Sequence, residues 1–285
     1  MSYQKFSERI GKRVAKVEIQ LDYIDEDLLN GLWNVVYGYF VKPLGDYRYF
    51  QDSPFQDIIF ELWLNHYKLP IDKIPSLSDN LRNKIRNDFF SWDYLDVYDF
   101  IDFLANRNSR YFNRDGFVSS CNIILKRELS GYRFVNNTLT PITNDLEIET
   151  IEKTINDSKG LGFEGVSLHL TNSLEKLSSR KNPDYRNSIK ESISALESIC
   201  QQITGDSKAE LGKALKKLKQ IIPIHGALEQ GFLKIYGYTS DSNGIRHALL
   251  EEDDLDQEDA LYMLVSCSAF INYLIAKWDK LYHQN

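Results

Sequence analysis

Apolar residues recur at helical spacing along most of the first half of the chain. Within residues 25–40, Leu28, Leu32 and Val36 lie four positions apart, which is the repeat of a helix with one buried face. Proline residues separate this segment from the next ones, as is typical of short connections in a helical bundle. Similar repeats predict further helices at residues 55–67, 77–90, 92–104 and 117–129.

The pattern changes after residue 130. Segments rich in β-branched and aromatic residues, at 132–135 and 138–142, flank the pair Asn136 and Asn137. Two such segments around a short polar pair are typical of a β-hairpin. The polar residues 143–145 can cap a helix that follows as far as residue 155.

The second half returns to helical spacing. Residues 185–204 carry Ile189, Ile193 and Leu196 on one face. Further helices are predicted at residues 167–179, 209–222, 226–236 and 255–282. The predicted fold class is therefore mainly α. An N-terminal helical domain with a small β-hairpin occupies residues 1–147, and a second helical bundle occupies residues 148–285.

Length and composition allow two domains with substantial cores. The chain has 285 residues, of which 42% are hydrophobic and 13% aromatic. Its formal net charge is −7. This acidic balance argues against a protein that coats nucleic acid without specificity, because such proteins carry a broad basic surface. An enzyme with one local basic site remains compatible with it.

The three cysteines, Cys121, Cys200 and Cys267, are odd in number and widely spaced. We therefore expect buried free thiols in a reducing compartment rather than disulfides. The polar N-terminus lacks the apolar stretch of a signal peptide, and no apolar run suggests a membrane span. These features predict a cytoplasmic protein that is not bound to a membrane. Because nucleotide-binding and zinc motifs do not occur, we expect no cofactor and no metal.

The segment after residue 236 is the strongest candidate for a chemical site. Asp241, Ser242 and Asn243 can accept hydrogen bonds from the free backbone N–H groups of a first helical turn. Arg246 and His247 follow in or near that turn. Such a helix end attracts anions, Arg can bind a phosphate with two hydrogen bonds, and His can transfer a proton near neutral pH. The alternative is an ordinary helix cap followed by one solvated charge and one packed ring.

Two charged segments have weaker functional interpretations. Lys213, Lys216 and Lys217 form the best basic patch of the sequence. Lys213 and Lys217 are four positions apart and so share one face of the predicted helix. The three lysines can guide an RNA backbone, or they can simply be a solvated helix face. The acidic run at residues 251–254 could hold a divalent cation, but a solvated loop that caps the last helix, through Asp254 and Gln257, is favoured.

Several ordered segments carry a resemblance to known families. In the second half these are residues 187–200, 225–228, 236–241, 244–248 and 264–273. This part resembles the HEPN domains of bacterial abortive-infection proteins. In the first half the segments are residues 6–9, 32–34, 131–134 and 141–143. This part is similar to the N-terminal domain of AbiJ-type abortive-infection proteins.

The resemblance implies an antiviral function. HEPN domains are helical bundles that form homodimers, and many are metal-independent endoribonucleases in which Arg and His converge at the dimer cleft. Abortive-infection members act as toxins that cut RNA and so stop phage growth. On this basis His247 would be a general acid or base and Arg246 would hold the phosphate. Asp241, Ser242 and Asn243 would shape the site. The expected partners are RNA, a second copy of the chain, and a trigger protein from the phage or the host.

The sequence departs from the family pattern in one respect. HEPN nucleases separate their Arg and His by four to six residues, whereas Arg246 and His247 are adjacent. Neighbouring residues on a helix point about 100° apart, so the two side chains of one protomer cannot face the same point as an i, i+4 pair can. A second hypothesis therefore stands beside the nuclease: a non-catalytic HEPN module for dimerisation or sensing that binds a partner or an anionic ligand. A nucleic-acid-binding adaptor is a third, which the acidic charge disfavours.

Overall fold

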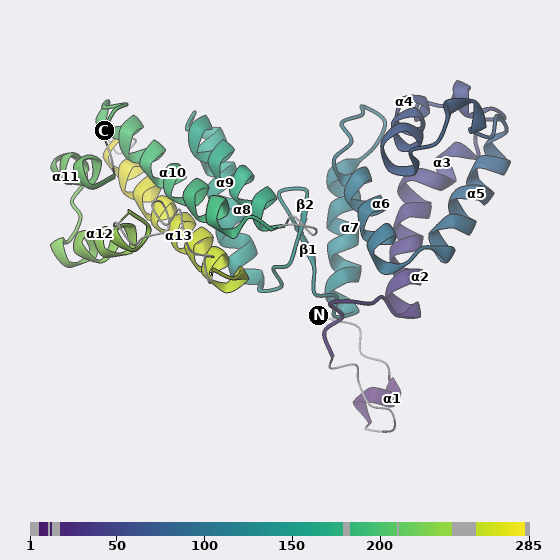
Figure 1. Cartoon of the computed structure of the whole chain (residues 1–285), viewed down its shortest axis with the longest axis horizontal. Coiled ribbons are helices and arrows are strands. Elements are labelled where there is room, and N and C mark those ends of the chain that lie inside the picture. Colours follow the sequence, from purple (N-terminus) through teal and green to yellow (C-terminus); the bar gives the residue numbers. More distant parts are fainter. Residues whose placement is uncertain are drawn as a thin grey trace. The chain divides into compact units, whose positions relative to one another are not determined.

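The computed structural model describes residues 6–10, 12, 18–178, 183–209, 211–240 and 255–282. The chain divides into two compact units, residues 1–143 (unit 1) and 144–285 (unit 2). The described residues are mainly helical and contain one two-stranded antiparallel sheet (Figure 1). This confirms the predicted fold class.

Unit 1 begins with the short helix α1 (Phe6–Arg9) and a first long helix, α2 (Glu26–Val36). The side chain of Asp25 accepts a hydrogen bond from the Leu28 backbone N–H at 2.9 Å and so caps α2. The chain continues without a break through the π-helical segment η1 (Tyr37–Val41) into α3 (Lys42–Leu44).

The other helices of unit 1 have 6 to 14 residues, and irregular segments join them. In one of them, α4 (Gln56–Glu61) runs into the π-helical η3 (Leu62–Tyr67), and Lys68 ends the run with a left-handed φ of 53°. The remaining elements are η2 (Phe50–Asp52), η4 (Ile71–Lys73), α5 (Ser78–Ser91), α6 (Tyr94–Ala105) and α7 (Arg114–Arg127). All four helices that the pattern predicted after residue 50 are present, with ends displaced by a few residues.

The predicted hairpin is present as β1 (Arg133–Val135) and β2 (Thr138–Thr140). Asn136 and Asn137 both have positive φ, 47° and 66°, as the tight turn of a two-residue hairpin requires. Asn122 on α7 holds the hairpin in place. Its amide accepts a hydrogen bond from the Phe134 N–H at 2.8 Å and donates one to the Phe134 carbonyl at 2.9 Å.

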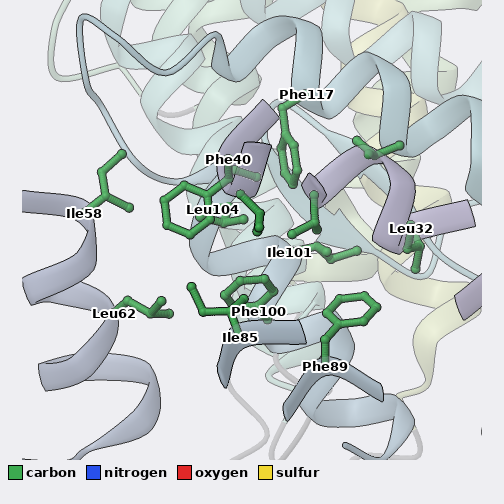
Figure 2. Close-up of a cluster of buried hydrophobic side chains, with 14 of the residues drawn as sticks. Leu32, Phe40, Ile58, Leu62, Ile85, Phe89, Phe100, Ile101, Leu104 and Phe117 are labelled. Atoms are coloured by element: carbon green, nitrogen blue, oxygen red, sulfur yellow. The ribbon is translucent and has the colours of Figure 1, made fainter. Parts of the chain in front are cut away.

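Large aromatic and branched side chains fill the core of unit 1 (Figure 2). Trp63 and Tyr98 are fully buried, and the hydroxyl of Tyr98 lies 2.8 Å from that of Ser130. Phe89 and Phe100 meet edge to face, with their centroids 6.1 Å apart and an interplanar angle of 71°. Each ring removes a large apolar area from water, so this cluster is the main source of stability in the unit.

Unit 2 is a bundle of longer helices. The helix α10 (Tyr185–Thr204) has the bounds that the sequence predicted, and it packs against α9 (Glu164–Leu177) and α13 (Gln257–Tyr282) (Figure 1). Its Asp184 cap accepts a hydrogen bond from the Asn187 N–H at 3.0 Å. The other helices are α8 (Asp145–Gly160), α11 (Leu211–Ile221) and α12 (Gly226–Ser240).

Three buried serines lie at the contact between α9 and α10. The hydroxyl of Ser173 is 3.0 Å from that of Ser188 and 2.9 Å from that of Ser192. Ser173 and Ser188 also each donate to the other's carbonyl oxygen at 2.9 Å. Small side chains let the two backbones approach closely, and these hydrogen bonds satisfy the polar groups that the contact buries.

The start of the last helix differs from the sequence prediction. The expected cap joined Asp254 and Gln257, but Gln257 is the first residue of α13. The reciprocal cap instead joins Asp256 and Asp259. The Asp259 N–H donates to the Asp256 carboxylate at 3.0 Å, and the Asp256 N–H donates to the Asp259 carboxylate at 3.3 Å. This reciprocal arrangement is a capping box, in which Asp259 takes the place of the usual Glu or Gln. Asp254 lies outside the described residues, as does the rest of the acidic run.

The same helix has the length and composition of a membrane span, contrary to the expectation that no such stretch occurs. Residues 257–281 have a mean hydropathy of 1.4 in their most apolar window. Half of that window is buried within the unit, where α13 packs against α8 and α10. A core helix of a bundle has the same composition, and this packing favours that interpretation.

The three cysteines are buried free thiols, as predicted. Burial raises the pKa of all three, to about 12 for Cys200 and Cys267, because the thiolate loses its solvation. At neutral pH these residues therefore act as small apolar side chains rather than as nucleophiles.

Candidate functional site

The residues that the sequence marks as catalytic lie outside the described residues. The described residues end at Ser240, the last residue of α12, and begin again at Leu255. Arg246 and His247 fall in this interval, and so do the site-shaping Asp241, Ser242 and Asn243. Their proposed roles therefore stay predictions, while the helices that precede and follow them, α12 and α13, are described.

The basic patch lies on the solvent face of α11. Lys213, Lys216 and Lys217 are all exposed. The opposite face is buried, because apolar side chains such as Leu215 and Leu218 repeat at helical spacing along it. The patch is therefore the polar half of an amphipathic helix, and its lysines are accessible to a ligand.

The lysines of α11 differ in whether a carboxylate already pairs with their charge. The Nζ atom of Lys217 contacts the carboxylate of Asp206, and this interaction lowers the pKa of Asp206. Lys219 pairs with Glu229 of α12 at 2.8 Å. Lys213 and Lys216 have no ion-pair partner in the part of the chain that the structure describes. These two lysines are the best placed to contact phosphate groups.

Another charged pair lies between α9 and α10. His169 Nδ1 is 2.7 Å from Glu191 Oε2, and the two side chains are 36% and 24% exposed. The ring of His169 is therefore partly accessible.

This pair has the chemistry of an oriented acid–base group. A carboxylate on one ring nitrogen fixes the orientation of the imidazole and leaves the other nitrogen for proton transfer. Sequence reasoning missed the pair because its members are 22 positions apart, and only the packing of α9 on α10 brings them together. It is also an ordinary arrangement for a surface ion pair, and it lies on different helices from the predicted catalytic turn.

Comparison with known proteins identifies the first part of the chain. Residues 4–157 match the family described as AbiJ N-terminal domain 4, which is more than half of the 285 residues. The match runs from before α1 into α8 and so includes all of the described elements of unit 1. No curated protein and no solved structure matches the chain.

Proposed function

The chain belongs to the AbiJ N-terminal domain 4 family, and from this premise we propose that it is a metal-independent endoribonuclease of an anti-phage abortive-infection system. An AbiJ-type N-terminal domain associates the chain with abortive infection. The match covers unit 1 and most of α8, so we assign RNA cleavage to the rest of unit 2, as a HEPN-type bundle. The match to the AbiJ-type N-terminal domain is the observation that carries the proposal.

The position of the basic face supports an RNA substrate. The exposed lysines Lys213 and Lys216 lie on α11, which packs against α10 and α12. The chain leaves α12 directly for the segment that contains Arg246 and His247. An RNA backbone bound along α11 would therefore lie on the helices that lead to the proposed site.

The proposed reaction uses the 2′-hydroxyl of the RNA as its nucleophile. His247 takes the proton of this hydroxyl, and the oxygen attacks the neighbouring phosphorus atom. The bond from phosphorus to the 5′-oxygen breaks, and that oxygen takes up a proton from water, while His247 releases its proton to the solvent. Arg246 stabilises the negative charge on the phosphate during this step. The products are a 2′,3′-cyclic phosphate and a 5′-hydroxyl.

A homodimer would solve the problem of the adjacent Arg and His. Within one protomer the two side chains point about 100° apart on a helix. Two copies of the segment that meet at one cleft can place Arg246 of one protomer opposite His247 of the other. Asp241, Ser242 and Asn243 would hold this segment in shape through hydrogen bonds to backbone N–H groups.

The test is RNA cleavage in the presence of EDTA by the wild type, Arg246→Ala and His247→Ala. We expect each variant to lose about 10²-fold or more in rate, which is the usual contribution of a positioned acid–base group. His225→Ala is the matched control, since this exposed His lies in the same unit, at the start of α12, and it should keep wild-type activity. Full activity in both Arg246→Ala and His247→Ala contradicts the proposed site.

His169→Ala separates the two candidate centres. If the site lies at residues 241–247, this variant cleaves RNA at close to the wild-type rate. If His169→Ala is inactive while His247→Ala is active, the catalytic centre belongs to the His169–Glu191 pair instead.

The adjacency of Arg246 and His247 favours one alternative function. In this alternative, unit 2 is a non-catalytic module for dimerisation or sensing that binds a phage or host trigger protein or an anionic ligand. Such a protein would protect cells against phage without cleaving RNA. Protection by His247→Ala equal to that by the wild type, together with no RNA cleavage by either protein, supports the alternative and contradicts the nuclease.

A further inference from the structure

A cavity of about 630 Å³ opens in unit 1 between the α2–η1 segment and α5. This volume lies within the range of about 300–1,000 Å³ that is typical of sites for small molecules. Its lining is polar and aromatic rather than purely apolar. Its lining includes Trp33, Asn34, Tyr37, Arg82, Asn83 and Arg86, together with the carboxylate of Asp79, which pairs with Arg82.

Arg86 brings a positive charge to the cavity. Its guanidinium group lies 5.4 Å from the ring centroid of Trp33 and 4.8 Å from that of Phe90. The side chain is exposed and has no ion-pair partner among the described residues. Stacking on two rings restricts the long side chain but uses none of its N–H donors, so the donors stay available for a ligand.

Arg82 lies one helical turn before Arg86 and on the same face of α5. Its Nη1 atom is 3.2 Å from Asp79 Oδ1, but the Asp79 side chain is 83% exposed. The Nε atom of Arg82 is buried and has no hydrogen-bond partner among the described residues. The side chain as a whole is 28% exposed, so its terminal nitrogens are the donors that a ligand in the cavity can reach.

Gly45 supports the position of Arg82. A Cβ atom at residue 45 would lie only 2.5 Å from Arg82 Nη1. The φ of Gly45 is −70°, a value that any residue can adopt. A side chain at this position would have to displace the end of the Arg82 side chain, so glycine leaves the guanidinium group the space that it occupies.

The remaining lining groups suit a nucleobase. Tyr37 exposes 38% of its surface, and its ring lies 6.2 Å from that of Trp33. Exposed aromatic rings stack on bases. Asn34 and Asn83 are exposed amides that can both donate to and accept from the edge of a base. Two guanidinium groups beside them can bind a phosphate.

From this combination we propose that the cavity binds a mononucleotide, with its phosphate on Arg82 and Arg86 and its base against Tyr37. The site would give unit 1 a ligand-binding role of its own. The proposal does not depend on RNA cleavage by unit 2, because the two units are compact separately and binding is measured without any reaction.

The first test is calorimetric titration of the full chain with AMP, GMP, CMP and UMP, each compared with its nucleoside and with inorganic phosphate. We expect at least one mononucleotide to bind one site per chain, at least tenfold more tightly than its nucleoside and than phosphate. If no mononucleotide binds, or if phosphate alone binds as tightly, the proposal is wrong.

Variants then locate the binding site. Arg82→Ala and Arg86→Ala should each weaken binding of the same mononucleotide at least tenfold. Arg110→Ala is the matched control, because Arg110 also lies beside an aromatic ring of unit 1, 5.8 Å from the centroid of Tyr111, but does not line the cavity. It should bind as the wild type does.

Arg86→Ala removes contacts with two rings and could unfold unit 1. Asn83→Asp therefore serves as a second variant that tests the same site. Asn83 is exposed, and the change places a negative charge beside the phosphate without removing a packed group. We expect weaker binding with an unchanged circular dichroism melting curve. Wild-type affinity in both Asn83→Asp and a folded Arg82→Ala would overturn the proposal.

Discussion

The two units reach stability through different kinds of packing. The largest fully buried side chains of the described residues, among them Trp63, Phe89 and Phe100, all belong to unit 1. In unit 2, by contrast, α9 and α10 meet through the small hydroxyl side chains of Ser173 and Ser188. Aliphatic residues fill most of the rest of the unit 2 core.

This difference accompanies a difference in regularity. In unit 1, π-helical and 3-10 segments interrupt the helices, and aromatic rings fill the space between the elements. Helices of 14 to 26 residues, such as α9, α10 and α13, can lie side by side over several turns. There, small residues permit a close approach. We therefore expect the two units to respond differently to changes in side-chain size.

The largest expected effect is loss of an aromatic ring from unit 1. Phe100→Ala removes a fully buried ring that contacts Phe89 and Trp92. We expect a loss of about 3–5 kcal/mol in the free energy of unfolding, from lost burial and from the cavity that remains. Urea unfolding followed by circular dichroism measures this value. Tyr111→Ala, at a ring that is 61% exposed, should change it by less than about 0.5 kcal/mol; equal effects would contradict the described core.

The next effect concerns added bulk in unit 2. Ser173→Val removes the hydroxyl that joins Ser188 and Ser192 and inserts a larger side chain at a close helix contact. We expect a loss of about 1–3 kcal/mol in the free energy of unfolding. Ser194→Val makes the same change at a half-buried position on the same helix as Ser188 and Ser192, and should cost less. A stabilising effect of Ser173→Val would show that the serine contact is not close-packed.

A third prediction sharpens the functional difference between the units. Lys213→Glu combined with Lys216→Glu reverses the two exposed charges of α11 that have no ion-pair partner among the described residues. We expect RNA binding to weaken about tenfold and its salt dependence to become shallower, because fewer counterions are released. Fluorescence anisotropy with labelled RNA at several salt concentrations measures both. Lys153→Glu combined with Lys159→Glu on α8 gives the same change in charge and should leave RNA affinity unchanged.

The smallest expected effect is a pH dependence of the free energy of unfolding that comes from His66 in unit 1. Burial among aromatic rings lowers the pKa of His66, although Asp99 and Asp96 act to raise it. The unfolded chain therefore binds this proton more readily, so His66 reduces stability as the pH falls through about 6.5 towards the lower pKa of the folded state. Replacement by His66→Phe should remove this contribution. Urea unfolding at pH 7.5 and 5.5 tests it: a wild type that loses no more stability than His66→Phe would contradict the prediction.

The sequence predicted the elements better than the contacts between them. Helices and the hairpin follow from local periodicity and from turn residues such as Asn136 and Asn137, which need no tertiary information. The cap of α13 was predicted two residues too early, because several acidic residues in a row offer equivalent partners.

The candidate sites show the same limit. The pairing of His169 with Glu191 and the cavity beside Arg82 both join residues that are distant in sequence. No local pattern marks such pairs, since their proximity depends on how the helices pack. The residues of the predicted catalytic turn, Arg246 and His247, are by contrast visible in the sequence but lie outside the described residues.

The central functional claim is that RNA itself supplies the nucleophile. The most direct measurement uses an RNA with one mapped cleavage position and a matched RNA that lacks only the 2′-hydroxyl at that position, both in EDTA. The account predicts that the wild type cuts the first and leaves a 2′,3′-cyclic phosphate, detected by mass spectrometry, and that it does not cut the second at that position. Cleavage of both RNAs, or of neither, would contradict it.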